Sequence, residues 1–200
     1  MTVVLWLIFA VVLWGIVHSI MASLGFKSLL QQTFGDSMMK FYRLFYNAFS
    51  TLSFVPILYL MIALPNRDLY QVPAPWSYLM LAGQGLSVIL LFAAVLQTDT
   101  LSFVGLRQIF SDDNKNGGLV VSGLYRFVRH PLYTFGLLIL WLTPSMTVNS
   151  LIVYISLTIY VLVGAYFEEQ KLLREFGQEY ADYLRSTPML IPGVKFGGNK

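Results

Sequence analysis

The 200-residue chain contains no cysteine and few charged residues. The absence of cysteine excludes a disulfide framework, a thiolate nucleophile and a cysteine-based metal centre. Only two histidines are present and they stand far apart in sequence, so no metal is expected. Charged residues make up 12% of the chain and hydrophobic residues 56%, whereas soluble domains are nearer a quarter charged. This composition indicates an all-α, polytopic integral membrane protein with a single domain over 1–200.

Five charge-free stretches predict membrane helices, because about 20 apolar residues are needed to cross a bilayer. They lie at about 3–24, 45–64, 77–97, 131–143 and 149–167. The first stretch lacks the basic segment and the cleavage site of a signal peptide, so we expect it to be retained. The fourth is short, since roughly 13 residues at 1.5 Å each give about 20 Å against a ~30 Å apolar core. We therefore expect it to be tilted or to cross only in part, with a turn around Pro144.

The basic residues predict the orientation of these helices. Twelve of the thirteen Lys and Arg residues fall in the loops 25–44 and 98–130 or after residue 167, and only Arg67 falls in the opposite loops. By the positive-inside rule, the N-terminus is expected outside and the C-terminus in the cytosol, in a bacterial inner membrane. The net charge of +3 follows from this asymmetry, so we expect membrane lipids and no nucleic acid as partners. Residues 112–118 of the second loop form a turn-forming cluster.

Two polar segments bracket the apolar hairpin formed by the last two helices. The first covers 123–133 and the second covers 168–188. No charge lies between Arg129 and Glu168, so the hairpin returns both segments to one membrane face, within reach of each other. Carboxylates at a membrane boundary are costly unless they are paired or functional, and Glu168 or Glu169 can be the one that faces inward. Polar groups gathered in this way suggest an active site.

The local sequence supports a binding role for both segments. His130 precedes Pro131, which suits the first turn of a helix, and the positive end of a helix dipole favours a carboxylate. The tail continues the last helix into the cytosol as an amphipathic helix with apolar residues three and four apart, which Gly177 is expected to break or kink. Its aromatic residues can dock an adenine ring or a lipid chain, or simply pack against the bundle.

At these residues the chain resembles the membrane methyltransferase superfamily of isoprenylcysteine carboxyl methyltransferases and phospholipid methyltransferases. The first shared pattern comprises Gly123, Tyr125, Arg129, His130, Pro131 and Tyr133, and the second comprises Glu168, Glu169, Leu172, Phe176, Gly177, Tyr180, Tyr183 and Pro188. The N-terminal half is similar to NnrU-like proteins and methanethiol S-methyltransferases. The residues that carry this second resemblance are His18, Ser19, Ala22, Ser23, Lys27, Tyr42, Arg43, Tyr46 and Asn47.

The resemblance implies a cytosol-accessible S-adenosylmethionine site and a second, lipid-facing opening for the methyl acceptor. The acceptor is expected to be a small or lipophilic molecule, either a thiol or an isoprenoid-like carboxyl or hydroxyl compound. The candidate catalytic residues are Glu168, which belongs to the shared pattern, and Arg174, which lies six residues further on and can steady an acceptor carboxylate. The implied cofactor-binding residues are Tyr125, Arg129, His130, Pro131, Tyr133, Glu169, Tyr180 and Tyr183. The candidates for substrate binding are His18, an ionisable residue inside a membrane helix, and Arg43 and Asn47, which share one helix face.

Other interpretations of the same residues remain open. Arg and Tyr residues also form the interfacial belt of ordinary membrane proteins, and a membrane histidine can simply bond a neighbouring helix. The alternative functions are a phospholipid amine methyltransferase, an NADPH-dependent sterol-reductase-like enzyme and a non-enzymatic NnrU-like accessory or transport protein. Binding of S-adenosylmethionine distinguishes the enzyme from the accessory protein.

Overall fold

The computed structural model describes residues 2–98 and 118–194. The expected turn-forming cluster at 112–118 lies almost entirely outside these residues. The described chain divides into two compact units. The first contains residues up to Leu69 and Thr147–Leu157, and the second contains Tyr70–Thr98, the described residues up to Met146, and the chain from Thr158 onward. Each unit is considered by itself, and the single-domain organisation expected from the sequence stays a prediction.

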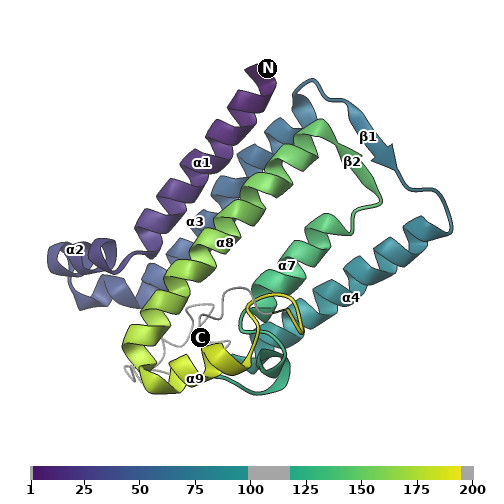
Figure 1. Ribbon diagram of the computed structural model, residues 1–200. Coiled ribbons are helices and arrows are strands. Elements are labelled where there is room, and N and C mark those ends of the chain that lie inside the picture. The colour runs from purple at the N-terminus through teal and green to yellow at the C-terminus, as the bar shows by residue number, and fades with distance from the viewer. Residues whose placement is uncertain (1, 99–117, 195–200) are drawn as a thin grey trace. The chain divides into compact units, whose positions relative to one another are not determined.

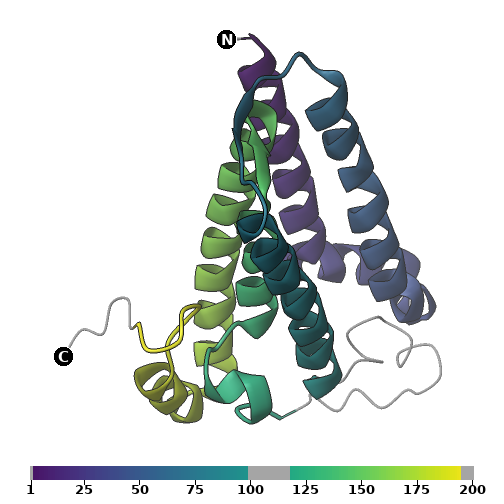
Figure 2. The same ribbon diagram turned by 90° about the vertical axis from the view of Figure 1, so that its right-hand side faces the viewer.

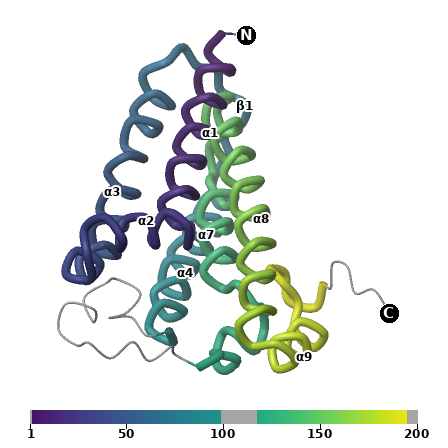
Figure 3. The backbone as a smooth tube through the Cα atoms, turned by 90° about the vertical axis from the view of Figure 1, so that its left-hand side faces the viewer, coloured from purple at the N-terminus to yellow at the C-terminus, as the bar shows by residue number. Residues whose placement is uncertain are grey.

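The first unit is built from three helices and the start of a fourth. Helices α1 (Thr2–Ala22), α2 (Leu24–Phe34) and α3 (Asp36–Ala63) follow one another, and the first turns of α8 (Val148–Phe176) complete the unit. Its buried core consists of Leu7, Val11, Ile57 and Val153. Figure 3 shows α2 as a short connection between the end of α1 and the start of α3.

The segment 25–44, expected to be a loop, is instead helical. The Ser23 side chain caps α2 by accepting a hydrogen bond from the backbone N–H of Phe26. Gly35 separates α2 from α3 with a φ of 77°, a conformation that side chains disfavour. The expectation of a loop was wrong because charge-free length detects membrane-spanning helices and misses amphipathic helices that carry charge.

The second unit places the short helix α7 beside a long one. It comprises α4 (Trp76–Gln97), the 3₁₀ turn η1 (Gly123–Arg126), α7 (Pro131–Trp141), the rest of α8, and α9 (Gln178–Ser186). Helices α4 and α7 lie side by side (Figure 1, Figure 2). The Gln84 side chain donates to the carbonyl oxygen of Ile139, and the Gln97 side chain accepts from the backbone N–H of Leu124. These two bonds fix η1 and α7 against α4.

Two short strands, which the sequence did not predict, flank the end of the hairpin. Strands β1 (Asp68–Gln71) and β2 (Ser145–Thr147) form a two-stranded sheet. The turn expected around Pro144 is present, and its carbonyl oxygen accepts a hydrogen bond from the backbone N–H of Val72. The chain between α7 and α8 is therefore held by backbone pairing.

Four described helices are long and apolar enough to cross a membrane: α1, α3, α4 and α8. Their outer faces carry large apolar side chains, of which Ile62 is 79% and Leu96 is 74% exposed. In water such surfaces would far exceed the few hundred Å² of apolar patch that soluble monomers tolerate. The protein is therefore an all-α integral membrane protein. α7 is the short fourth segment expected from the sequence, and its 11 residues cover roughly 16 Å.

The tail after α8 bends at Gly177, as the sequence predicted. α8 continues past Glu168 to Phe176, and α9 begins at Gln178. Gly177 adopts φ 56° and ψ −123°, a region that is essentially restricted to glycine. The bend turns α9 away from the axis of α8.

Replacing Gly177 with alanine should lower the free energy of unfolding by about 1–3 kcal/mol, because a Cβ is strained at this backbone conformation. Open space surrounds the position, so the added Cβ meets no neighbouring atom. Any loss of stability is therefore due to the strained backbone conformation and not to a steric clash. Gly164→Ala is the matched control, since Gly164 lies inside α8 and also has open space around it. There alanine should be neutral or stabilise by up to about 1 kcal/mol. Denaturant unfolding of both variants measures the difference, and equal effects would contradict the assignment of strain to Gly177.

Candidate functional site

The start of α7 and the end of α8 bring His130 between the two adjacent glutamates. The His130 Nε2 atom lies 3.2 Å from Oε1 of Glu169, and Nδ1 lies 3.6 Å from Oε2 of Glu168. The Tyr133 hydroxyl donates to Glu168 at 2.8 Å, and its ring stacks on the imidazole with centroids 5.2 Å apart. His130 is the N-cap residue of α7, but its side chain makes no capping bond. The imidazole is therefore directed at the carboxylates.

The two glutamates differ in their surroundings. The side chain of Glu169 is 11% exposed and faces His130 and Arg129, whereas that of Glu168 is 45% exposed. A buried carboxylate needs a positive partner or hydrogen bonds, and Glu169 has both. Glu168 is the carboxylate that a ligand arriving from solvent can reach.

Arg129 connects Glu169 to the end of α9. Its Nε and Nη2 atoms both lie 2.7 Å from Oε1 of Glu169, and the arginine side chain is 7% exposed. Its Nη1 atom donates to the carbonyl oxygens of Leu184, at 3.1 Å, and Thr187. The last carbonyls of a helix lack partners within the helix, so this guanidinium caps α9 while it neutralises Glu169. Most of its donors are thereby used inside the protein.

The chain after α9 runs back along the start of α7. The backbone N–H groups of Arg129 and His130 donate to the carbonyl oxygens of Pro188 and Met189 at 2.9 and 3.1 Å. The Thr134 hydroxyl lies 2.8 Å from the carbonyl oxygen of Leu190. Segment 188–190 therefore holds His130 in place through the main chain.

Three tyrosines complete the cluster. The Tyr183 hydroxyl donates to the carbonyl oxygen of Tyr125 at 2.5 Å. Burial raises the pKa of Tyr183 to about 12, and burial together with the charge of Glu168 raises the pKa of Tyr125 to about 12. Both therefore stay protonated near neutral pH. Tyr180 is 1% exposed, and within the described part of the chain its hydroxyl finds no hydrogen-bond partner. Burial, followed by the charge of Glu169, raises the pKa of Tyr180.

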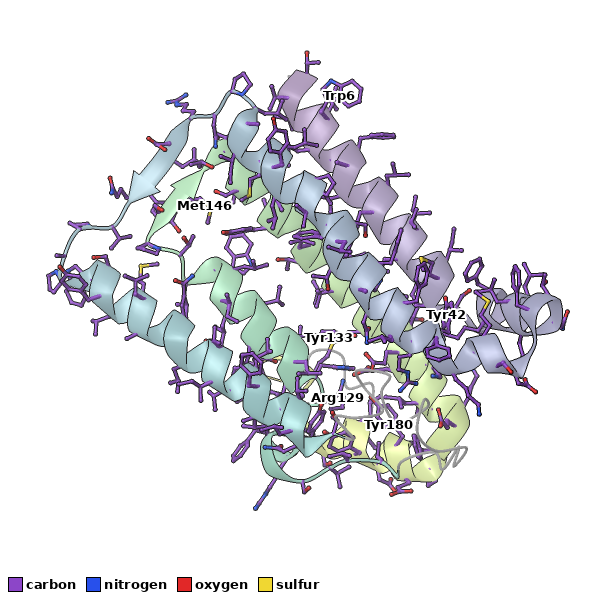
Figure 4. All side chains as sticks on the ribbon, turned by 180° about the vertical axis from the view of Figure 1, so that it is seen from behind. Trp6, Tyr42, Arg129, Tyr133, Met146 and Tyr180 are labelled. Atoms are coloured by element: carbon purple, nitrogen blue, oxygen red, sulfur yellow. The ribbon has the colours of Figure 1, made fainter. Side chains whose placement is uncertain are left out.

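Most of the site residues predicted from the sequence come together in this one unit. Figure 4 shows Arg129, Tyr133 and Tyr180 close to one another. The gathered residues are Tyr125, Arg129, His130, Tyr133, Glu168, Glu169, Tyr180 and Tyr183, with Pro131 buried in the first turn of α7. Arg174 is exposed in the last turn of α8. Six residues place it about 9 Å along the axis and about 120° around the helix from Glu168, so its catalytic role stays a prediction.

The three candidates for substrate binding lie in the first unit. Nε2 of His18 lies 2.7 Å from the hydroxyl of Tyr46, and its ring packs 5.0 Å from that of Trp14. Arg43 is exposed and Asn47 is half-buried on α3. Their role in binding a substrate stays a prediction.

Sequence reasoning did not select Trp14 or Thr134 as site residues. Trp14 stands four residues before His18 on α1, a spacing that places both side chains on one helix face and was available as a signal. The Thr134 hydroxyl contacts the tail at the backbone carbonyl of Leu190. A pattern of side chains in the sequence does not predict a contact with a backbone carbonyl.

One family profile matches nearly the whole chain. The NnrU family, described as NnrU protein, matches residues 6–192. The chain belongs to the NnrU family. This assignment confirms the resemblance seen in the two motifs and in the N-terminal half.

This NnrU-family protein is also similar to curated methanethiol S-methyltransferases. Methanethiol S-methyltransferase 2 of Bradyrhizobium diazoefficiens is 38% identical over 123 residues, which are 58% of this chain and 46% of that protein. The methanethiol S-methyltransferase of Crocosphaera subtropica is 32% identical over 130 residues, 60% of this chain and 51% of that protein. The methanethiol S-methyltransferase of Pseudomonas deceptionensis is 42% identical over 72 residues, which are 36% of this chain and 28% of that protein.

The chain spans about half, or less, of the length of these curated relatives. No solved structure gives a significant match. The chemistry of the site therefore has to be argued from its own residues. Glu169 is neutralised by Arg129, whereas Glu168 has no Lys or Arg partner among the described residues and lies beside an imidazole and a buried hydroxyl. Such a set suits a ligand that carries both a positive group and hydrogen-bond acceptors.

Proposed function

We propose that this protein is an S-adenosylmethionine-dependent methyltransferase of the membrane whose acceptor is a thiol. The observation that carries the proposal is the position of His130 between Glu168 and Glu169. The Tyr180 hydroxyl, which has no hydrogen-bond partner among the described residues, lies close to the same ion pair. The three relatives described above are named methanethiol S-methyltransferases, and these names support methyl transfer to a small thiol.

The residues present fit S-adenosylmethionine in charge and in hydrogen bonding. The donor carries a sulfonium, an ammonium and a carboxylate, and its net charge is positive. Glu168 supplies the opposite charge at the solvent-facing edge of the cluster. Within residues 2–98 and 118–194 the buried Tyr180 hydroxyl finds no acceptor, and a ribose or adenine atom would satisfy it, because unpaired buried polar groups are costly. The half-buried ring of Tyr133, which stacks on His130, is the aromatic surface we assign to the adenine.

The assignment of Glu168 follows from how charge changes during the reaction. When bound, S-adenosylmethionine supplies an electrophilic methyl group: the acceptor sulfur forms the new carbon–sulfur bond, the electron pair of the broken bond stays on S-adenosylhomocysteine, and the thiol proton goes to solvent. A carboxylate at the sulfonium would stabilise the ground state more than the transition state, because that charge is lost. We therefore assign Glu168 to the ammonium group, oriented by Tyr133 and His130.

The remaining predicted residues take supporting roles. Arg129 holds Glu169 and the end of α9, and so positions the imidazole of His130. A simple alkanethiol is almost fully protonated at neutral pH, and the cation of Arg174 would favour the thiolate. We also propose that this cluster lies at the cytosolic face of an inner membrane, with the N-terminus outside, and the twelve basic residues on one side support this orientation.

The experiment is calorimetric titration of S-adenosylmethionine and S-adenosylhomocysteine into the protein in lipid nanodiscs, followed by transfer of labelled methyl groups to methanethiol. We expect dissociation constants from about 1 μM to 1 mM, the usual range for substrates, and labelled dimethyl sulfide as the product. Absence of binding to protein that retains its helical circular dichroism would overturn the proposal and favour an accessory membrane role.

A further inference from the structure

The second unit contains an apolar groove next to the candidate donor site. We call it the α7 groove. It has a volume of about 600 Å³ and lies between one face of α7, the middle of α8 and the tail after α9. Six of its lining residues are Leu137, Leu138, Trp141, Leu162, Leu190 and Ile191.

The few polar atoms in the lining already have partners. The Trp141 indole N–H donates to the Thr158 hydroxyl at 3.0 Å. The Thr134 hydroxyl lies 3.1 Å from the carbonyl oxygen of His130 and 2.8 Å from that of Leu190. The α7 groove therefore presents hydrocarbon to its occupant, and a polar ligand would find few groups to bond.

One end of the α7 groove adjoins the residues that hold His130. Thr134 lines the groove and bonds to the His130 carbonyl, while Met189 also lines it and accepts from the His130 backbone N–H. From Thr134 to Trp141 the groove follows α7 for about 10 Å. An elongated apolar molecule lying in it would bring one end close to the start of α7, where the proposed donor site begins.

The size of the α7 groove exceeds what a one-carbon thiol needs. Pockets of roughly 300–1,000 Å³ hold drug-sized ligands, and at about 600 Å³ this one falls within that range. Methanethiol, the acceptor in the names of the relatives, has a single carbon. Such a small acceptor would contact only a small part of the apolar surface of the groove.

We propose that the α7 groove binds the hydrocarbon chain of the acceptor, so that this protein methylates alkanethiols several carbons long in preference to methanethiol. This inference rests on the proposed function. The reaction is the transfer described above: the alkanethiol sulfur gains the methyl group of S-adenosylmethionine, S-adenosylhomocysteine leaves with the bond's electron pair, and the thiol proton goes to solvent. Each methylene buried in the groove adds about fourfold to kcat/KM for that acceptor.

The test compares kcat/KM for octanethiol and methanethiol in the wild type and in two tryptophan variants, all in the same nanodiscs. Leu162→Trp fills the groove. Ile159→Trp is the matched control, because Ile159 lies on the same helix, is exposed to a similar extent (56% against 43%) and does not line the groove. Long thiols concentrate in a bilayer, so a higher rate with octanethiol in the wild type would not by itself show binding in the groove. Both variants are measured in the same nanodiscs, so this concentration effect is equal for the two and cancels in their comparison.

We expect the octanethiol to methanethiol ratio to fall at least tenfold in Leu162→Trp and to stay within twofold of the wild type in Ile159→Trp. If Leu162→Trp does not fold, Leu138→Trp fills the groove from α7. Equal ratios in Leu162→Trp and Ile159→Trp would overturn the inference, and a membrane lipid would then be the expected occupant of the groove. Folded protein that methylates no thiol would instead overturn the proposed function, a distinct result.

Discussion

Arg129→Ala should lower the free energy of unfolding by about 3–5 kcal/mol, because it leaves a buried carboxylate without its counter-ion. Glu169 is 11% exposed and the guanidinium is its closest positive partner. The substitution also removes the donor that caps the carbonyl oxygens of Leu184 and Thr187 at the end of α9. Denaturant unfolding of the detergent-solubilised protein, monitored by circular dichroism, measures the loss of stability.

The control is a second arginine–carboxylate pair in the same unit. Arg185 lies 3.0 Å from Asp182, but both side chains are exposed, at 68% and 63%. An exposed pair of this kind contributes at most about 1 kcal/mol, so Arg185→Ala should change stability little. Arg129→Lys should recover only part of the loss, because an ammonium cannot reach the carboxylate and two carbonyls in the fixed geometry of a guanidinium. A loss for Arg129→Ala no larger than for Arg185→Ala would contradict the assigned role.

His130→Ala should weaken binding of S-adenosylhomocysteine by about 10- to 100-fold, the effect of losing a hydrogen bond to a charged group in a buried site. The imidazole lies 3.2 Å from Glu169, 3.6 Å from Glu168 and stacks on Tyr133. Without it, each carboxylate loses one of the groups that hold it at the start of α7. Calorimetric titration of the variant in nanodiscs gives the affinity.

Two glutamate variants sharpen this measurement. Glu168→Gln removes the charge assigned to the donor's ammonium group and should weaken binding without loss of stability, because the side chain is partly exposed. Glu179→Gln, an exposed carboxylate in the first turn of α9, should leave the affinity unchanged. If His130→Ala or Glu168→Gln bound S-adenosylhomocysteine as well as the wild type, the donor site would have to lie elsewhere.

Several features of this protein could be predicted without coordinates. Charge-free length located α1, α4 and the apolar part of α8, and it predicted that α7 is short. It failed for residues 25–44, where α2 and the start of α3 carry charge and form helices through capping and one glycine. A helix surrounded by lipid is apolar on all sides, so its composition reveals it. An amphipathic helix carries charge on one face, so its average composition resembles that of a loop.

The convergence of the two polar segments was also determined by the sequence. A hairpin of two apolar helices must return its charged ends to one face, because charges do not rest in hydrocarbon. That argument alone brings His130 near Glu168 and Glu169. It says nothing of Segment 188–190, whose backbone bonds to Arg129 and His130 depend on where the tail returns.

Only the tertiary structure decided which partner each side chain takes. Adjacent residues on a helix point about 100° apart, so Glu168 and Glu169 cannot both face Arg129, and the sequence does not record the rotation of α8 about its axis. Packing fixed that rotation: it buried Glu169 against Arg129, left Glu168 at the solvent edge, and enclosed the Tyr180 hydroxyl without a partner among the described residues. The sequence thus determined which groups gather at the membrane boundary, while the packing of α7, α8 and α9 determined which of them remain available to a ligand.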